Sequence, residues 1–172
     1  MILKRSACRF LRDQSTAPAV KICGLTDPEQ ALAIAAMGVD AIGVIGVAGT
    51  PRYVKDTPRR DLFSQLSQHC PEVHRVWVVA DASEEELDAA LQGDGTPTVV
   101  QLHGKETPEQ CLALRQRHPK TSVWKALRLR SLEDLKSVEN YLESVDALLL
   151  DAWSPDQLGG LSLIHISEPT RR

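Results

Sequence analysis

The sequence has no dense group of basic side chains and no long apolar run, and these two absences exclude broad classes of protein. Its 20 Lys and Arg residues are outnumbered by 23 Asp and Glu residues, which gives a net charge of −3. A mildly acidic chain without a basic stripe has no field that attracts nucleic acid. No apolar run approaches the roughly 20 residues that a helix needs to cross a bilayer. We therefore expect neither nucleic acid nor a membrane as a partner.

Signals for secretion, metal binding and dinucleotide binding are also missing. The first three residues are followed at once by Lys4 and Arg5, so the N-terminus has no secretory apolar region. The four cysteines lie far apart without a CxxC pair, which favours reduced thiols in a cytosolic protein. HExxH, clustered Cys/His pairs and GxGxxG are all absent. The sequence thus predicts a cytoplasmic location and supports no metal or dinucleotide cofactor.

What the sequence does contain is one repeated pattern, in which a short apolar run is followed by a helix-start signal and a helical stretch. Hydrophobic residues make up 42% of the chain, enough to bury a substantial core. Most of the apolar runs are continuous and rich in Val, Ile and Leu, which is typical of parallel strands buried on both faces. The predicted strands are residues 19–24, 40–47, 74–80, 98–102, 122–127 and 145–150.

Capping chemistry marks the predicted helix starts. The runs TDPE at 26–29, SEEE at 83–86 and TPEQ at 107–110 each indicate a capping box, whose polar side chains satisfy the first backbone N–H groups. Thr57-Pro58 opens a helix that ends at Gln68, and Ser131 caps a helix that ends near Tyr141.

Strict alternation of strands and helices with short connections predicts a parallel α/β fold with right-handed crossovers. Periodicity alone leaves two architectures open, a doubly wound open sheet and part of a barrel. The motifs described below favour the barrel. Complete barrels of this kind usually need about 200 residues or more, so only about six units fit here. The predicted fold class is therefore α/β, a (β/α)8 TIM barrel that is incomplete, with about six of its eight βα units.

The pattern divides the chain into three segments. Residues 1–18 precede the first strand; their stretch from Lys4 to Arg12 is basic and free of acids, as in a transit peptide, but we interpret them as an N-terminal extension. Residues 19–160 form the predicted partial barrel. Residues 161–172 show neither strand–cap–helix order nor a helical stripe and resemble a translated sequencing adapter, so we interpret them as a non-native tail.

The strongest local motif is KICGLT at residues 21–26. It places Cys23 where a barrel strand delivers its side chain to the C-terminal, catalytic face. A thiol there can be tuned to a thiolate by neighbouring positive charge and then act as a base. Cysteine is also among the most commonly buried residues, so a structural role stays open. Lys21 either lines the barrel or projects outward.

Further motifs follow in order, and together they make the chain resemble the phosphoribosylanthranilate isomerase family. The resemblance covers residues 20 to 160, and its motifs are KICGLT at 21–26, DAIGVIG at 40–46, TPRYV at 50–54, VVQLHG at 99–104, LLLD at 148–151 and LGG at 158–160. Several motifs in the right order are far more specific than any one of them. The family fold is a (β/α)8 barrel, in agreement with the pattern of strands and helices.

The resemblance implies an isomerase of tryptophan biosynthesis. Its reaction is the Amadori rearrangement of N-(5-phosphoribosyl)anthranilate to 1-(2-carboxyphenylamino)-1-deoxyribulose 5-phosphate, with a small phosphosugar as substrate and without metal or cofactor. Carried over by position, Cys23 is the general base that takes the C2′ proton, and Asp151 is the general acid that opens the furanose ring. Arg52 binds the anthranilate carboxylate, which suits its planar guanidinium. From its place beside Gly104 we also take His103 as a substrate-binding candidate that would line the site.

Each role has a structural alternative. Asp151 would cap the next turn, Arg52 would be a solvated loop charge, and His103 would be a satisfied structural histidine. Another phosphosugar barrel, such as an epimerase or indoleglycerol-phosphate synthase, should instead show a catalytic Lys or a metal-binding His/Asp set. A third possibility is a non-catalytic fragment that associates with another chain. We read Cys8, Cys70 and Cys111 as structural.

Two units of the family barrel have no counterpart in the sequence. In such barrels the loops after the seventh and eighth strands usually hold the substrate phosphate. Without them we expect the chain alone to be inactive, and we expect the strands around Ile22 and Leu149 to have unpaired edges.

Overall fold

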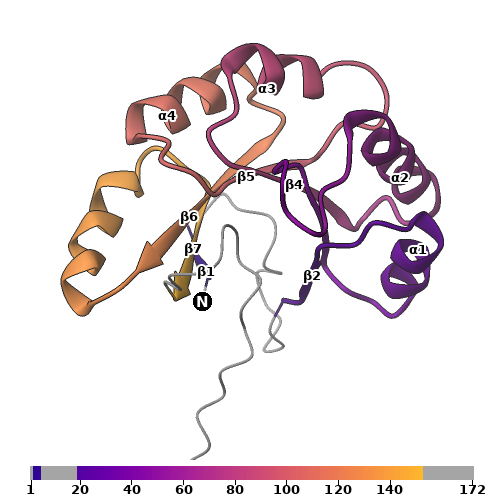
Figure 1. Cartoon of the computed structure of the whole chain (residues 1–172), viewed down its shortest axis with the longest axis horizontal. Helices are drawn as coiled ribbons and strands as arrows, with labels where there is room; N and C mark the ends of the chain where they lie inside the picture. Colours follow the sequence, from indigo (N-terminus) through magenta and orange to yellow (C-terminus); the bar gives the residue numbers. More distant parts are fainter. Residues whose placement is uncertain (1, 5–18, 153–172) are drawn as a thin grey trace, which may run out of the picture.

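The apolar runs form the strands of one curved sheet, and the capped stretches form helices on its convex side (Figure 1). The computed structural model describes residues 2–4 and 19–152. The strands are β1 (Ile2–Lys4), β2 (Lys21–Cys23), β3 (Ala41–Ile45), β4 (His74–Val79), β5 (Val99–Leu102), β6 (Ser122–Leu129) and β7 (Ala147–Ala152). The helices are α1 (Pro28–Ala36), α2 (Asp56–His69), α3 (Glu84–Ala90), α4 (Pro108–Arg117) and the 3-10 helix η1 (Leu132–Tyr141).

The sheet topology is that of a partial barrel. Its strand order is β1-β7-β6-β5-β4-β3-β2, so each strand from β2 to β7 lies beside its sequence neighbour. All neighbouring pairs from β2 to β7 are parallel. A doubly wound sheet would reverse its strand order and carry helices on both faces. Here the described helices lie on one side, which confirms the predicted α/β fold with six barrel strands.

Side chains alternate between two apolar layers. The layer between sheet and helices contains residues such as Val44, Trp77 and Leu102, packed against Phe63 and Leu114 of the helices. The second layer fills the concave side, and its members are Ala41, Ile45, Val76, Val78, Val99, Trp124 and Ala147. Because both faces of the strands are covered, the runs in the sequence are continuous rather than alternating.

The predicted capping boxes at two helices are confirmed. In α3, Ser83 Oγ accepts the N–H of Glu86, and the Glu86 carboxylate accepts the N–H of Ser83. In α4, Thr107 and Gln110 form the same reciprocal pair. These contacts satisfy backbone donors that a helix start leaves open.

The predicted start of α1 is wrong by one residue. The N-cap is Asp27, not Thr26, and its carboxylate accepts the N–H of Glu29 at 3.2 Å. The reason is Pro28, whose fixed φ suits the first helical position and therefore makes the preceding residue the cap.

The last predicted helix is a 3-10 helix. Its apolar residues Leu135, Val138 and Tyr141 are spaced by three, which matches three residues per turn. Val138 is buried. At its start the Asp134 carboxylate accepts the N–H groups of Arg130 and Ser131. The sequence therefore contained a signal for this helix type, in its period of three.

The edge of the sheet differs from the prediction. Residues Ile2–Lys4, which we assigned to an extension, form β1 and pair antiparallel with β7, with Ile2 opposite Leu149. The expectation of an unpaired edge around Leu149 is therefore wrong. At the other edge, β2 has no outer neighbour among the described strands. Residues 5–18 and 153–172, which include Cys8, the LGG motif and the predicted tail, lie outside the described residues.

No helix in the described part of the chain has the length and apolar character needed to cross a membrane.

Candidate active site

The four predicted site residues lie at one end of the sheet. Cys23 is the last residue of β2, His103 directly follows β5, and Asp151 lies near the end of β7. Arg52 belongs to the loop that leaves β3. Because β2 to β7 are parallel, their carboxyl ends share one edge, which is where barrel enzymes place their sites.

Two glycines make room for Cys23 and Arg52. A Cβ on Gly43, the register partner of Cys23, would lie 2.6 Å from the Cys23 Sγ atom. Gly24 has a φ of +84°, and a Cβ there would lie 2.7 Å from Cδ of Arg52. The exposed Arg52 side chain thus lies over the backbone next to Cys23. The structure therefore places Arg52 against Gly24, the residue that follows Cys23.

His103 and Asp151 form a second pair. The distance from His103 Nε2 to Asp151 Oδ2 is 3.5 Å, longer than a hydrogen bond. His103 is only 6% exposed, and its Nε2 atom has no hydrogen-bond partner among the described residues. A buried polar atom without a partner is unusual in a protein interior and calls for an explanation. A ring nitrogen kept available beside a carboxylate fits a substrate site better than a satisfied structural histidine.

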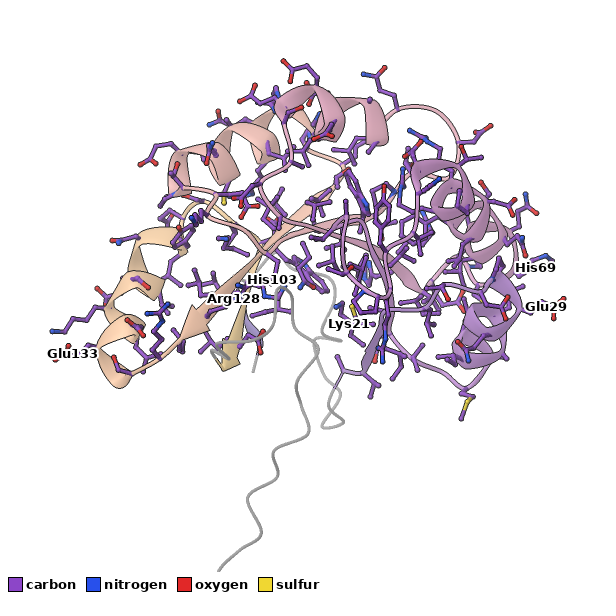
Figure 2. All side chains as sticks on the ribbon, in the orientation of Figure 1. Lys21, Glu29, His69, His103, Arg128 and Glu133 are labelled. Carbon is purple, nitrogen blue, oxygen red and sulfur yellow. The ribbon has the colours of Figure 1, made fainter. Side chains whose placement is uncertain are left out.

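The concave face carries further polar residues that sequence reasoning missed. Arg128 on β6 lies in register with Asp151 on β7, and it shares a face with Trp124 because it lies four residues further along the strand. Figure 2 shows Arg128, His103 and Lys21 on the concave side of the sheet. Lys21 therefore lines the barrel and does not project outward. Alternation along β6 was the signal that would have found Arg128.

One cavity of the described structure lies apart from the four predicted residues. It has a volume of about 520 Å3 and is lined by Tyr53, Val54, Arg59 and Trp77, behind the loop that carries Arg52. The charged groups there are engaged with one another, since Asp56 accepts hydrogen bonds from both Arg59 and Arg60. None of the four predicted residues lines it. Among the described residues no group of three or more His, Cys, Asp or Glu side chains could hold a metal ion.

Cys111 has the environment of a structural cysteine. Its side chain is fully buried, and burial raises the pKa of its thiol to about 11. An apolar environment disfavours the charged thiolate, so this residue stays a neutral thiol near pH 7. Cys23, in contrast, is only partly buried.

We expect Cys111 to make the native state less stable at high pH. Its folded pKa lies above the unfolded value, so its contribution is complete below about pH 9 and is lost as the pH rises towards 11. The free energy of unfolding should fall by about 2 kcal/mol over this range. Denaturant titrations of the parent chain and of Cys111→Ala at pH 8, 9.5 and 10.5 would measure it. The free energy of unfolding of Cys70→Ala, the control, should fall with pH as it does in the parent chain. If that of Cys111→Ala falls equally steeply, the expectation is contradicted.

Comparison with known proteins supplies a family. A family model described as N-(5′-phosphoribosyl)anthranilate (PRA) isomerase matches residues 20–161. The protein named N-(5′-phosphoribosyl)anthranilate isomerase from Synechococcus elongatus is 46% identical over 141 residues, which are 82% of this chain and 64% of the relative. The chain therefore spans less than two thirds of that relative's length.

Solved structures agree with the family model. The crystal structure of phosphoribosyl anthranilate isomerase from Thermotoga maritima has a TM-score of 0.71 and 30% identity, covering 83% of this chain and 65% of that one. A crystal structure of phosphoribosyl anthranilate isomerase in complex with reduced 1-(o-carboxyphenylamino)-1-deoxyribulose 5-phosphate has a TM-score of 0.69 and 30% identity. The match covers 79% of this chain and 66% of that one.

Proposed function

The chain belongs to the N-(5′-phosphoribosyl)anthranilate isomerase family, and on this basis we propose that it carries the acid and base of that isomerase. The reaction is the Amadori rearrangement of N-(5-phosphoribosyl)anthranilate, an aminoaldose, to the corresponding aminoketose in tryptophan biosynthesis. Its substrate is a small phosphosugar, and its location is the cytoplasm. One observation carries the proposal: Cys23 and Asp151 lie at the same end of a curved parallel sheet, on its two outermost barrel strands.

The chemistry needs one acid and one base on opposite sides of a small substrate. Asp151 gives a proton to the furanose ring oxygen, the bond from that oxygen to C1′ breaks, and the anthranilate nitrogen supplies the electron pair for an iminium ion. Cys23 then removes the C2′ proton, and the electron pair of that bond neutralises the iminium to an enolamine. Tautomerisation gives the aminoketose. One proton is taken up and one is released, so the sequence of steps needs no oxidant.

Arg52 and His103 would bind and orient the substrate. Arg52 packs against Gly24, the residue after Cys23, and its planar guanidinium can hold the anthranilate carboxylate there by two parallel hydrogen bonds. The Nε2 atom of His103, which has no hydrogen-bond partner among the described residues, faces Asp151 and can donate a hydrogen bond to the sugar or accept one from it.

The experiment uses a joined chain, in which residues 1–160 are followed by the C-terminal part of the Synechococcus elongatus relative that continues beyond the matched region. The purified joined chain is incubated with N-(5-phosphoribosyl)anthranilate, and the aminoketose is quantified by chromatography. We expect turnover on the scale of ordinary enzymes, about 1 s−1 or faster. A folded joined chain that gives no product would contradict the proposal.

Replacement of Arg52 by Ala should mainly raise KM in the joined chain. The loss of a two-point carboxylate contact is expected to raise KM by about 10-fold or more, and Arg52→Lys should recover only part of it because an ammonium is a point charge. Steady-state kinetics measure both constants. Lys55→Ala, which removes another exposed cation from the same loop, is the matched control and should leave KM unchanged. If Arg52→Ala behaves like the control, Arg52 does not bind substrate.

A further inference from the structure

A buried ion pair joins β6 to the loop that follows His103. Nζ of Lys125 lies 2.8 Å from Oε2 of Glu106, and the two side chains are only 2% and 8% exposed. Lys125 points away from the concave face, into the layer beneath the helices, so neither charge can reach a substrate directly. Removing two charges from water is costly, and such a pair seldom increases net stability over well-packed apolar residues. Its presence calls for another role.

The pair also binds the backbone of the loop. Glu106 accepts the N–H of Gly104 at 3.0 Å and the N–H of Asp81 at 2.8 Å. Lys125 donates to the carbonyl oxygen of Gly104 at 2.7 Å. The backbone N–H and the carbonyl oxygen of Gly104 are thus both hydrogen-bonded to the ion pair. Tyr141 adds a hydrogen bond from its hydroxyl to the Glu106 carbonyl oxygen at 3.0 Å.

The neighbouring loop after β4 packs tightly against the same glycine. Asp81 has a φ of +53°, and its Oδ1 atom accepts the N–H of Lys105 at 2.6 Å. A Cβ on Gly104 would lie 2.4 Å from that carboxylate oxygen, so only glycine fits. Positive φ is uncommon outside glycine and is tolerated best by Asp and Asn. The two loops are therefore fixed to each other by several independent contacts.

These contacts fix the backbone position of His103. Its own N–H donates to the Val79 carbonyl oxygen at 2.7 Å, and the next residue is the glycine bound by the ion pair. We propose that the Glu106–Lys125 ion pair is a positioning device that holds the His103 ring against Asp151. The proposal rests on the function proposed above, because it makes both residues positioning residues for that reaction. An error of about 1 Å in a catalytic geometry can cost about 100-fold in rate.

A second ion pair, whose side chains are 28% and 17% exposed, provides a control at the opposite end of the sheet. Nε of Arg115 lies 3.0 Å from Oδ1 of Asp146, and Oδ2 of Asp146 accepts the N–H of Val123 at 2.8 Å. This pair also joins a charge to a strand backbone, but at the amino-terminal ends of β6 and β7. That end of a barrel contributes to stability and not to the site.

The first measurement detects a change in the environment of the His103 ring and does not depend on enzyme activity. The ring signals of the joined chain are recorded by proton–nitrogen NMR and assigned with His103→Gln. In the parent we expect one sharp set of His103 ring signals. In the double variant Glu106→Leu/Lys125→Met these signals should broaden or move towards those of an exposed imidazole. In Arg115→Met/Asp146→Asn they should stay in place.

The second measurement separates positioning from stability. Glu106→Leu and Lys125→Met alone each leave an unpaired buried charge and should lower Tm by about 5 °C or more. The double variant leaves no charge and should regain much of that Tm, yet its loop has lost the bonds to Gly104 and Asp81. We expect its kcat to stay about 10- to 100-fold below the parent, with a smaller change in KM. The Arg115/Asp146 control should lower Tm without lowering kcat.

Two results would overturn the proposal. One is a double variant whose His103 ring signals match the parent. The other is a double variant whose kcat recovers together with its Tm, as a purely structural ion pair requires. If the parent joined chain has no isomerase activity, the proposed function fails, while the NMR comparison still decides whether the ion pair positions His103.

Discussion

Replacing Cys23 by Ser, or Asp151 by Asn, is expected to lower kcat of the joined chain by about two orders of magnitude or more. A hydroxyl at position 23 is far less acidic than a thiol, so it cannot form a useful base near pH 7. An amide at position 151 has no acidic proton to transfer. General acid and base groups typically contribute about 100- to 10,000-fold. Steady-state rates on the purified variants measure the effect.

Controls separate chemistry from folding and binding. Cys70→Ser changes a partly buried thiol outside the site and should retain nearly all activity. Both catalytic variants should bind a reduced aminoketose product analogue with an affinity close to that of the parent, measured by calorimetry. Turnover of Cys23→Ser within a few-fold of the parent would remove this residue from the mechanism, and the same result for Asp151→Asn would leave it with a structural role.

The polypeptide of residues 1–172, expressed alone, is expected to show no measurable turnover. It spans 64% of the Synechococcus elongatus relative, and barrel enzymes of this type commonly bind phosphate through loops after their seventh and eighth strands. Binding energy from a remote phosphate normally supports chemistry at the reacting centre. We expect a loss of kcat/KM of at least about 1,000-fold relative to the joined chain.

The same polypeptide should also associate. The outer edge of β2 has no partner among the described strands, and open edges with apolar neighbours pair with other chains. Light scattering after size-exclusion chromatography should show higher-order species for residues 1–172 and a discrete species for the joined chain. A discrete and fully active polypeptide of residues 1–172 would show that six βα units suffice.

Much of the fold could be predicted because its determinants are local. The strands are continuous apolar runs, and the two capping boxes at Ser83 and Thr107 depend on residues only three positions apart. The same local logic explains the error at α1, where Thr26 and Asp27 are both good caps and the ring of Pro28 decides between them. Strand bounds differ by a few residues, because backbone pairing and not composition ends a strand.

Features that depend on distant residues could not be predicted. Pairing of Ile2–Lys4 with β7 joins segments far apart in the sequence. The ion pair between Glu106 and Lys125 looks, in sequence, like two ordinary charges. Only the packing of β6 against the loop after β5 makes them partners. Arg128 differs from these, because the alternation along β6 by itself places it on the same face as Trp124.

The site was predicted through the resemblance and not through chemistry alone. A lone strand-end cysteine such as Cys23 is ambiguous in isolation, and it was the order of several motifs that indicated the family, which the comparisons confirm. The alternative of another phosphosugar barrel is therefore wrong at the level of family. The catalytic roles of Cys23 and Asp151 remain a proposal, supported by their shared end of the sheet.

Growth without tryptophan tests the central claim most directly. A bacterial strain that lacks its own phosphoribosylanthranilate isomerase would carry the joined chain, its Cys23→Ser variant or its Cys70→Ser variant, at equal protein levels. We predict growth on tryptophan-free medium with the joined chain and with Cys70→Ser, and none with Cys23→Ser. Equal growth with Cys23→Ser, or no growth with a folded joined chain, would contradict the account.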